Sequence, residues 1–274
     1  MENTPDRACG EVTLPPRSWL FAPGHSEKLL RQVFDAGADI VLLDLEDAVP
    51  PEMKDRARDM VAEVAAGRAC WVRVNRARSE ECVRDLKALA GAVSGLRVPK
   101  VESAADVSWV AERAPAVPLD CTIESARGVL AAFEIASTSS CALLSYGGLD
   151  LAADLGIAGG EQETLLARSF LVVAARAAGK PPPSDGVYPF LHDDDGLRKE
   201  AEAARRLGFF GKSAIHPRQV PIINAVFAPR PEEVAWARQV LSAFEESGGA
   251  ATKTSGGEFV DKPVAERARR ILNA

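Results

Sequence analysis

Acidic residues follow short apolar runs of this chain, at positions where the strands of a parallel sheet would end. Glu124 follows the run Leu119–Ile123, and Asp150 follows the neighbouring run Ala142–Ser145. No Cys or His lies beside them in the sequence, and carboxylates alone suit a hard cation that prefers oxygen. Mg²⁺ commonly takes one or two carboxylates and completes its shell with water and substrate oxygens. We therefore expect Glu124 and Asp150 to hold one divalent cation, Mg²⁺ or alternatively Mn²⁺.

Each of these two carboxylates also has a purely structural interpretation. Glu124 alone would serve as an ion-pair partner of Arg127 or of a nearby lysine. Asp150 alone would serve as the N-cap of a helix that begins at Leu151. Only the combination of the two residues with other polar groups at strand ends favours a metal site.

Further polar groups follow the other apolar runs. These groups are Asp44, Glu46, Asp47, Arg73, Asn75, Lys100, Glu102, Arg127 and His216. The structural interpretation of Arg73 is a salt bridge to Glu46, and that of Glu46 and Asp47 is a hydrogen-bond network on the rim of the fold. A solvated surface alone does not require charged residues directly after several separate apolar strands, so their recurrence favours a functional site.

Eight short apolar runs alternate with helical stretches, and together they would position these groups. The runs are Ser18–Ala22, Asp39–Leu45, Cys70–Val74, Leu96–Val101, Leu119–Ile123, Ala142–Ser145, Ser184–Val187 and Lys212–Ile215. This alternation predicts a closed parallel (β/α)8 barrel, in which functional side chains lie at the carboxyl ends of the strands. A doubly wound open sheet normally has fewer units, and no GxGxxG follows the first run. The length of 274 residues suits one barrel, which needs about 250.

Amphipathic segments separate the apolar runs. They are Ser26–Ala36, Glu52–Ala65, Glu80–Ala92, Ala104–Arg113, Ala126–Ala136, Glu163–Ala178 and Leu197–Leu207. Beyond them we expect a helix over Glu232–Glu245, a flexible linker over Ser247–Gly257 and a terminal helix over Asp261–Leu272. The predicted organisation is a barrel domain over residues 1–225, followed by a helical lid or oligomerisation segment over residues 226–274.

The composition is that of an ordinary soluble globular protein. Hydrophobic residues make up 47% and charged residues 26%, while the net charge of −6 predicts no nucleic-acid partner. No apolar run approaches the roughly 20 residues of a membrane helix, and the polar segment Met1–Pro16 does not read as a signal peptide. The five cysteines, Cys9 among them, show no CxxC spacing. A cytoplasmic protein with reduced thiols is therefore expected.

Several sequence blocks together resemble one known family. They are RSWLFAPGHSEKL, DIVLLDLEDAV, VRVN, PKVES, IESARG, GGLDLAADLG, GFFGKSAIHPRQV and FVDKP, in family order from Arg17 to Pro263. The chain thereby resembles the citrate lyase β-subunits and the malyl-CoA and citramalyl-CoA lyases, within the wider group of metal-dependent aldolases. The resemblance implies a TIM barrel whose C-terminal extension acts as a lid over an active site.

The resemblance also implies roles for individual residues. Glu124 and Asp150 match the metal ligands, and Glu124 would also contact substrate. Arg73 matches the residue that holds substrate oxygens. The remaining matched positions are Glu46 and Asp47, an acidic pair that supports catalysis; Phe21, Lys28, Ile215 and His216, which contact coenzyme A; and Asp261, a catalytic acid delivered from a neighbouring subunit.

Two positions depart from the family pattern. Many members read GxED where this chain reads Gly148-Leu149-Asp150, so the acid that precedes the metal-ligand position is missing. A second lysine that contacts coenzyme A is replaced by Gln32, and the adjacent Arg31 offers a substitute charge.

The function implied by the resemblance is a Mg²⁺-dependent carbon–carbon lyase of the oxo-acid-lyase class. Its substrate would be a 3-hydroxyacyl-CoA thioester such as malyl-, citramalyl- or citryl-CoA, or the keto acid of the reverse reaction. Two alternatives stay open: a hydroxyacyl-CoA thioesterase on the same scaffold, and a β-subunit that requires the other parts of a citrate lyase complex. A homotrimer or hexamer is expected, because Asp261 would serve another subunit.

Overall fold

The computed structural model describes residues 15–89 and 91–273, which form two compact units. The larger unit is Pro15–Phe227, and the smaller contains residues 228–273. Cys9 and most of the N-terminal segment lie outside the described residues, whereas Cys70, Cys82, Cys121 and Cys141 are buried free thiols. Among the described residues, no helix is both long and apolar enough to cross a membrane.

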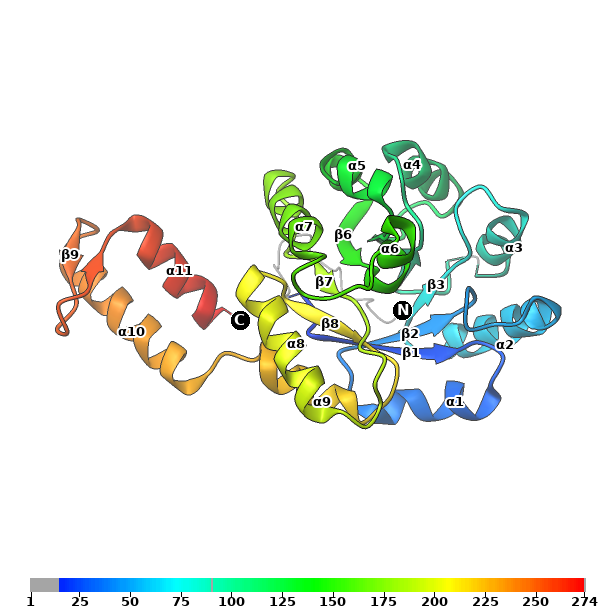
Figure 1. The fold of residues 1–274 in the computed structure, drawn as a ribbon, viewed down its shortest axis with the longest axis horizontal. Helices are drawn as coiled ribbons and strands as arrows, with labels where there is room; N and C mark the ends of the chain where they lie inside the picture. The colour runs from blue at the N-terminus through cyan, green and yellow to red at the C-terminus, as the bar shows by residue number, and fades with distance from the viewer. Residues whose placement is uncertain (1–14, 90, 274) are drawn as a thin grey trace, which may run out of the picture. The chain divides into compact units, whose positions relative to one another are not determined.

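The larger unit is a closed barrel of eight parallel strands in sequence order, with β8 paired to β1 (Figure 1). The strands are β1 (Ser18–Pro23), β2 (Ile40–Asp44), β3 (Trp71–Arg73), β4 (Gly95–Val98), β5 (Leu119–Ile123), β6 (Cys141–Tyr146), β7 (Ser184–Asp185) and β8 (Gly211–Ala214). The predicted (β/α)8 TIM barrel is therefore confirmed. The strands β2, β5 and β6 are almost wholly buried, as expected for strands covered on both faces.

Helices surround the strands of this unit (Figure 1). They are α1 (Glu27–Gln32), α2 (Lys54–Gly67), α3 (Glu80–Leu89), α4 (Ala104–Arg113), α5 (Ala126–Ser137), α6 (Gly148–Leu155), α7 (Leu165–Ala177), α8 (Asp194–Leu207) and α9 (Gln219–Phe227). Ser26, Ser103 and Ser125 each cap a helix by accepting a hydrogen bond from a backbone N–H three residues later. These caps define where α1, α4 and α5 leave the mouth of the barrel.

Helix α6 directly follows β6 and begins three residues before the helix at Leu151 that Asp150 was expected to cap. Its N-cap is Gly147, and Asp150 is the third residue of the helix. The N-cap interpretation of Asp150 is therefore wrong, because the cap position lies three residues earlier.

The smaller unit contains α10 (Pro231–Glu246), β9 (Thr252–Lys253), β10 (Phe259–Val260) and α11 (Lys262–Leu272). Strands β9 and β10 form an antiparallel pair, with Thr252 opposite Val260. The prediction of a flexible linker over Ser247–Gly257 is thus wrong for Thr252–Lys253, which pair with Phe259–Val260. The physical reason is burial, since Val260 is fully buried in an apolar cluster with Val240 and Phe244 of α10.

Candidate active site

A cavity of about 380 Å³ lies among the barrel strands and the segments that follow them. Six of the predicted site residues line it: Phe21, Asp47, Arg73, Glu124, Asp150 and Ile215. They come from β1, the segment after β2, β3, the segment after β5, α6 and the segment after β8. The barrel thus brings together residues that are almost 200 positions apart in the sequence.

The two carboxylates proposed as metal ligands face this one cavity from neighbouring βα units. Glu124 is buried, with 5% exposure, whereas Asp150 is exposed. Burial, together with the negative charges of Glu46 and Asp150, raises the pKa of Glu124 to about 8. A cation between the two carboxylates would relieve this repulsion, so the residues fit a hard divalent metal. Within the described ranges, no group of three or more His, Cys, Asp or Glu side chains is arranged to hold a metal ion. Water and substrate would therefore complete the shell.

The carboxylate of Glu124 is positioned by backbone rather than by Arg127. Its Oε1 accepts a hydrogen bond of 2.6 Å from the backbone N–H of Lys100, in the segment after β4. Gly147 lies on its other side, and a Cβ atom there would collide with the side chain of Glu124. Glu124 thus fits between the segments that follow β4 and β6.

Arg73 is held by two acidic residues of β2 and the loop after it. Its Nε and Nη2 atoms donate to the two carboxylate oxygens of Asp44, each at 2.7 Å, and Nη1 lies 3.1 Å from Oε2 of Glu46. Although burial opposes the charge, Asp44 and Glu46 raise the pKa of Arg73, which stays a cation. The guanidinium carbon lies 4.8 Å from the ring centroid of Phe21. The alternative of a salt bridge to Glu46 is present, but Asp44 is the bidentate partner.

Asp44 was given no role from the sequence, although its position within an apolar run indicated one. It is an acid within the apolar run IVLLD, and it is 1% exposed. A buried carboxylate in such a run requires a buried partner. Only the pairing of β2 with β3, which sets Asp44 opposite Arg73, identifies that partner.

Two lysines stabilise the loop after β2 through ion pairs and hydrogen bonds. Lys100 Nζ lies 2.6 Å from Glu46 Oε1 and 3.2 Å from Asp47 Oδ2. Lys54 Nζ donates to the carbonyl oxygens of Leu45 and Glu46 at 2.6 and 2.7 Å. Sequence reasoning assigned neither lysine a role. The available signal for Lys54 was its position at the first residue of α2, where a cation opposes the helix dipole.

The floor of the cavity is polar. Arg97 of β4 donates from Nε to Asp120 at 2.5 Å and from Nη1 to the hydroxyl of Ser213 at 2.9 Å. The hydroxyls of Thr122 and Ser145 lie 2.9 Å apart beside them. Arg97, Thr122, Ser145 and Ser213 all line the cavity, which therefore ends in hydrogen-bonding groups.

Among the other predicted residues of the barrel, Lys28, Glu46 and His216 do not line the cavity. Lys28 is exposed on α1, and His216 follows β8 with its Nδ1 accepting from the backbone N–H of Arg218. Asp261 belongs to the smaller unit, where it is the N-cap of α11 and accepts from the N–H of Val264 at 3.1 Å. Arg31, the substitute charge beside Gln32, pairs with Glu27 at 2.7 Å.

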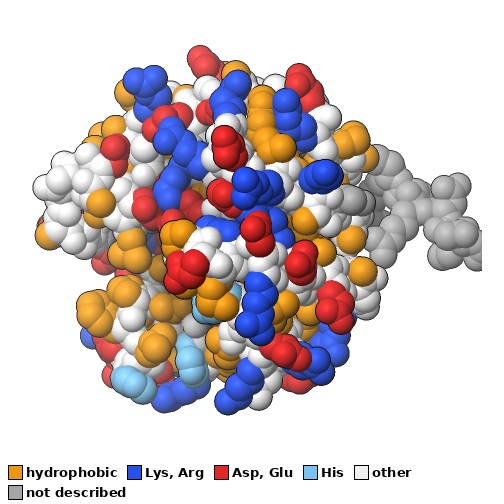
Figure 2. All heavy atoms as spheres, turned by 90° about the vertical axis from the view of Figure 1, so that its right-hand side faces the viewer, with side chains coloured by type: hydrophobic (Ala, Val, Ile, Leu, Met, Phe, Trp, Pro, Cys, Tyr) orange, Lys and Arg blue, Asp and Glu red, His pale blue; other side chains and the backbone are white. Residues whose placement is uncertain are grey.

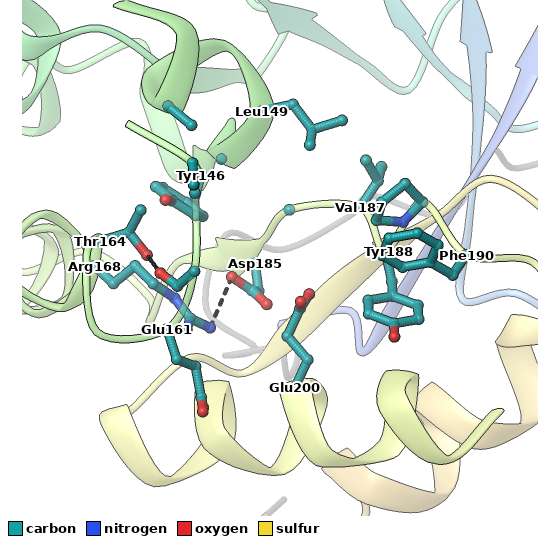
Figure 3. A pocket seen from close by; sticks show the side chains of 17 residues that line it. Tyr146, Leu149, Glu161, Thr164, Arg168, Asp185, Val187, Tyr188, Phe190 and Glu200 are labelled. Carbon is teal, nitrogen blue, oxygen red and sulfur yellow. Dashed lines mark hydrogen bonds and ion pairs between the residues drawn. The ribbon is translucent and has the colours of Figure 1, made fainter. Parts of the chain in front are cut away.

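A smaller cavity of about 170 Å³ shares part of its lining with the first, including Tyr146 and Gly186. Figure 3 shows Arg168 and Asp185 pointing toward each other in it, and their closest atoms lie 3.2 Å apart. Lys212 Nζ donates to the second oxygen of Asp185 at 2.7 Å. These pairs anchor the short strand β7, so they also hold Gly186, which forms part of the wall of the main cavity.

The face of the protein in Figure 2 carries acidic and basic side chains interspersed, with hydrophobic ones between them. Among the side chains coloured there, no continuous basic patch dominates this face.

Comparison with known proteins identifies similar chains. The family described as HpcH/HpaI aldolase/citrate lyase matches residues 17–217, and the family described as C-C bond lyase of the TIM-barrel fold matches residues 173–274. The (3S)-malyl-CoA thioesterase of Cereibacter sphaeroides is 40% identical over 242 residues, which cover 85% of this chain and 84% of that protein. The citrate lyase subunit beta of Leuconostoc mesenteroides is 34% identical, covering 93% and 92%. The crystal structure of protein CitE from Mycobacterium tuberculosis, in complex with magnesium, acetoacetate and coenzyme A, superposes with a TM-score of 0.81 at 33% identity, covering 94% and 97%.

Proposed function

Because the chain belongs to the HpcH/HpaI aldolase/citrate lyase family, we propose that it is a Mg²⁺-dependent carbon–carbon lyase acting on a 3-hydroxyacyl-CoA thioester. The observation that carries this proposal is the convergence of Glu124, Asp150 and Arg73 on one cavity. Two carboxylates and a guanidinium suit a reaction in which negative charge develops on oxygen.

Glu124 and Asp150 would hold the cation, which when bound supplies a Lewis acid toward carbonyl and carboxylate oxygens. Arg73 has five N–H donors, and two of them donate to Asp44, whereas Nη1 forms an ion pair with Glu46 that is not a hydrogen bond. The remaining donors, on Nη1 and Nη2, are available to a keto-acid oxygen. Asp44 fixes the plane of the guanidinium, so these donors point in a defined direction without reorganisation.

In the cleavage direction the 3-hydroxyl group loses its proton, and the bond between C2 and C3 breaks. The C3 fragment leaves as a carbonyl compound, and the electron pair passes to C2 to give a thioester enolate. A proton then adds to C2 of the enolate. We assign this proton transfer to Asp261, delivered from a second subunit of a homotrimer or hexamer.

Coenzyme A would lie at the rim of the cavity, against Phe21 and Ile215, with Lys28 and His216 along its path. The presence of magnesium and coenzyme A in the similar CitE structure supports both ligands for this chain. The predicted role of Glu46 and Asp47 is supported by their contacts, since they position Arg73 and Lys100.

A second candidate function is hydrolysis of the thioester. It is favoured by one observation, the 40% identity to a protein named (3S)-malyl-CoA thioesterase. Hydrolysis breaks the C–S bond and leaves the carbon skeleton of the hydroxy acid intact. The two candidate activities therefore differ in both products.

The test is turnover of malyl-, citramalyl- and citryl-CoA by the full chain with Mg²⁺, with both products identified by mass. A keto acid together with a shortened acyl-CoA is the expected result. Free coenzyme A with an intact hydroxy acid would instead identify the protein as a thioesterase. Activity that appears only after addition of a citrate lyase α-subunit and acyl carrier protein would instead identify a dependent β-subunit.

A further inference from the structure

The segment that follows β4 contains one residue more than regular pairing with β5 would allow. The N–H of Leu96 donates to the carbonyl of Pro118, and the N–H of Val101 donates to the carbonyl of Thr122. The chain therefore advances five residues on the β4 side against four on the β5 side. Lys100 lies within this bulge and has a φ of 53°, a left-handed conformation that residues other than glycine rarely adopt.

The bulge releases the backbone N–H of Lys100 from the sheet. This group donates instead to Oε1 of Glu124, at 2.6 Å. A backbone donor has no rotamer freedom, and its hydrogen bond to this carboxylate strengthens when the carboxylate loses its proton to bind a cation. It leaves Oε2 of Glu124 for other ligands, since the amide occupies Oε1.

The side chain of Lys100 holds the bulge from its other end. Its Nζ lies 2.6 Å from Oε1 of Glu46 and 3.3 and 3.2 Å from the two carboxylate oxygens of Asp47. Both acids belong to the loop after β2, which Lys54 fixes through its hydrogen bonds to main-chain carbonyls. These contacts join the loops after β2 and β4, and they offset the cost of a left-handed residue.

We propose that Lys100 is a positioning residue for Glu124: its left-handed bulge supplies the backbone donor, and its ion pairs with Glu46 and Asp47 hold that donor in place. The inference rests on the proposed function in one respect, the assignment of Glu124 as a ligand of a divalent cation. Lys100 positions Glu124 before any substrate binds. Its role is therefore measured by cation binding rather than by turnover.

The experiment is titration of the full chain with Mg²⁺ by calorimetry, with thermal unfolding recorded for each variant. Lys100→Met keeps the aliphatic stem but removes the ion pairs, and we expect about tenfold weaker Mg²⁺ binding, as for other residues that orient a metal ligand. Lys100→Asn removes the same charge with a side chain that tolerates the left-handed conformation, and it should also weaken binding. Lys100→Arg should retain most of the affinity.

Arg78 offers a matched control. It is another cationic residue with a left-handed φ, 70°, and it pairs with Asp106 at 3.0 Å, but it does not line the cavity. Arg78→Met should therefore leave Mg²⁺ affinity unchanged. An equal loss of affinity in Arg78→Met and Lys100→Met would overturn the inference.

A double-variant comparison tests whether Lys100 acts through Glu124. Adding Lys100→Met to Glu124→Gln should cause no further loss of affinity, and additive losses would contradict the proposal. If Glu124→Gln weakens binding while both Lys100→Met and Lys100→Asn bind normally, only the role of Lys100 is overturned. If Glu124→Gln itself binds Mg²⁺ normally, the metal assignment of the proposed function fails as well.

Discussion

Glu124 shows how one side chain acquires unusual chemistry from its surroundings. It is buried near Glu46 and Asp150, and it accepts a hydrogen bond from the backbone N–H of Lys100. Burial and the two neighbouring charges raise its pKa to about 8, so near neutral pH the free protein holds a proton there. A metal ion must displace that proton, which links cation binding to pH.

The first prediction concerns this linkage. Mg²⁺ affinity should rise with pH by up to about tenfold per unit below pH 8 and then level off, because one proton is released on binding. Calorimetry at pH 7 in two buffers of different ionisation enthalpy measures the proton release directly. Glu124→Gln should remove the pH dependence along with most of the affinity. Mg²⁺ binding at pH 7 without proton release would contradict the raised pKa.

The second prediction concerns Asp150, which is exposed and lies in the first turn of α6. Asp150→Asn removes one of two anionic ligands, and we expect at least tenfold weaker Mg²⁺ binding with almost unchanged stability. Asp154→Asn on the same helix is the control, since Asp154 accepts from the N–H of Ala126 and does not line the cavity. Equal Mg²⁺ affinity in the two variants would remove Asp150 from the metal site.

At the scale of elements, the start of α6 must approach β5 closely. Gly147 is the N-cap of α6, and its α-carbon lies against the side chain of Glu124. No side chain fits there, so the connection from β6 to α6 depends on glycine. The loops after β2 and β4 are joined in a different way, by the ion pairs of Lys100.

The third prediction follows from this close approach. Gly147→Ala should displace Glu124, lower the free energy of unfolding by about 1–3 kcal/mol and weaken Mg²⁺ binding. Urea unfolding and calorimetry measure the two effects. Gly67→Ala at the end of α2 is the control, because a Cβ there meets nothing within 4 Å and the residue has no left-handed φ. An unchanged Mg²⁺ affinity in Gly147→Ala would show that Glu124 is not constrained by this contact.

At the scale of the whole molecule, the barrel and the smaller unit carry different parts of the proposed chemistry. The barrel holds the cavity, whereas Asp261 lies at the start of α11 in the smaller unit. If Asp261 serves the cavity of another subunit, activity becomes a property of the oligomer.

The fourth prediction uses hybrids between two inactive variants. Co-expressed Glu124→Gln and Asp261→Asn chains, mixed equally, should regain about a quarter of the normal turnover, because one site in four would combine an intact barrel with an intact tail. Each variant alone should be nearly inactive, and sedimentation should give a trimer or hexamer. If verified mixed oligomers recover no turnover, Asp261 either acts within its own chain or takes no part in the mechanism.

The sequence by itself determined the barrel and the residues at its mouth. Alternation of apolar runs and amphipathic helices is a local pattern, and parallel strands that end in polar groups bring those groups to one side. Glu124, Asp150, Arg73 and Asp47 follow from this pattern, whereas Phe21 follows only from the family resemblance, and all five line the cavity.

Only the tertiary structure decided which side chains are partners. The bidentate contact of Asp44 with Arg73, the bulge at Lys100 and the pair of Arg97 with Asp120 depend on how neighbouring strands are aligned. That alignment arises when the barrel closes, through contacts between segments far apart in the chain, and no local pattern encodes it. For the same reason the donor to Glu124 is a backbone N–H, which is chemically the same in every residue except proline and becomes distinctive only through its position.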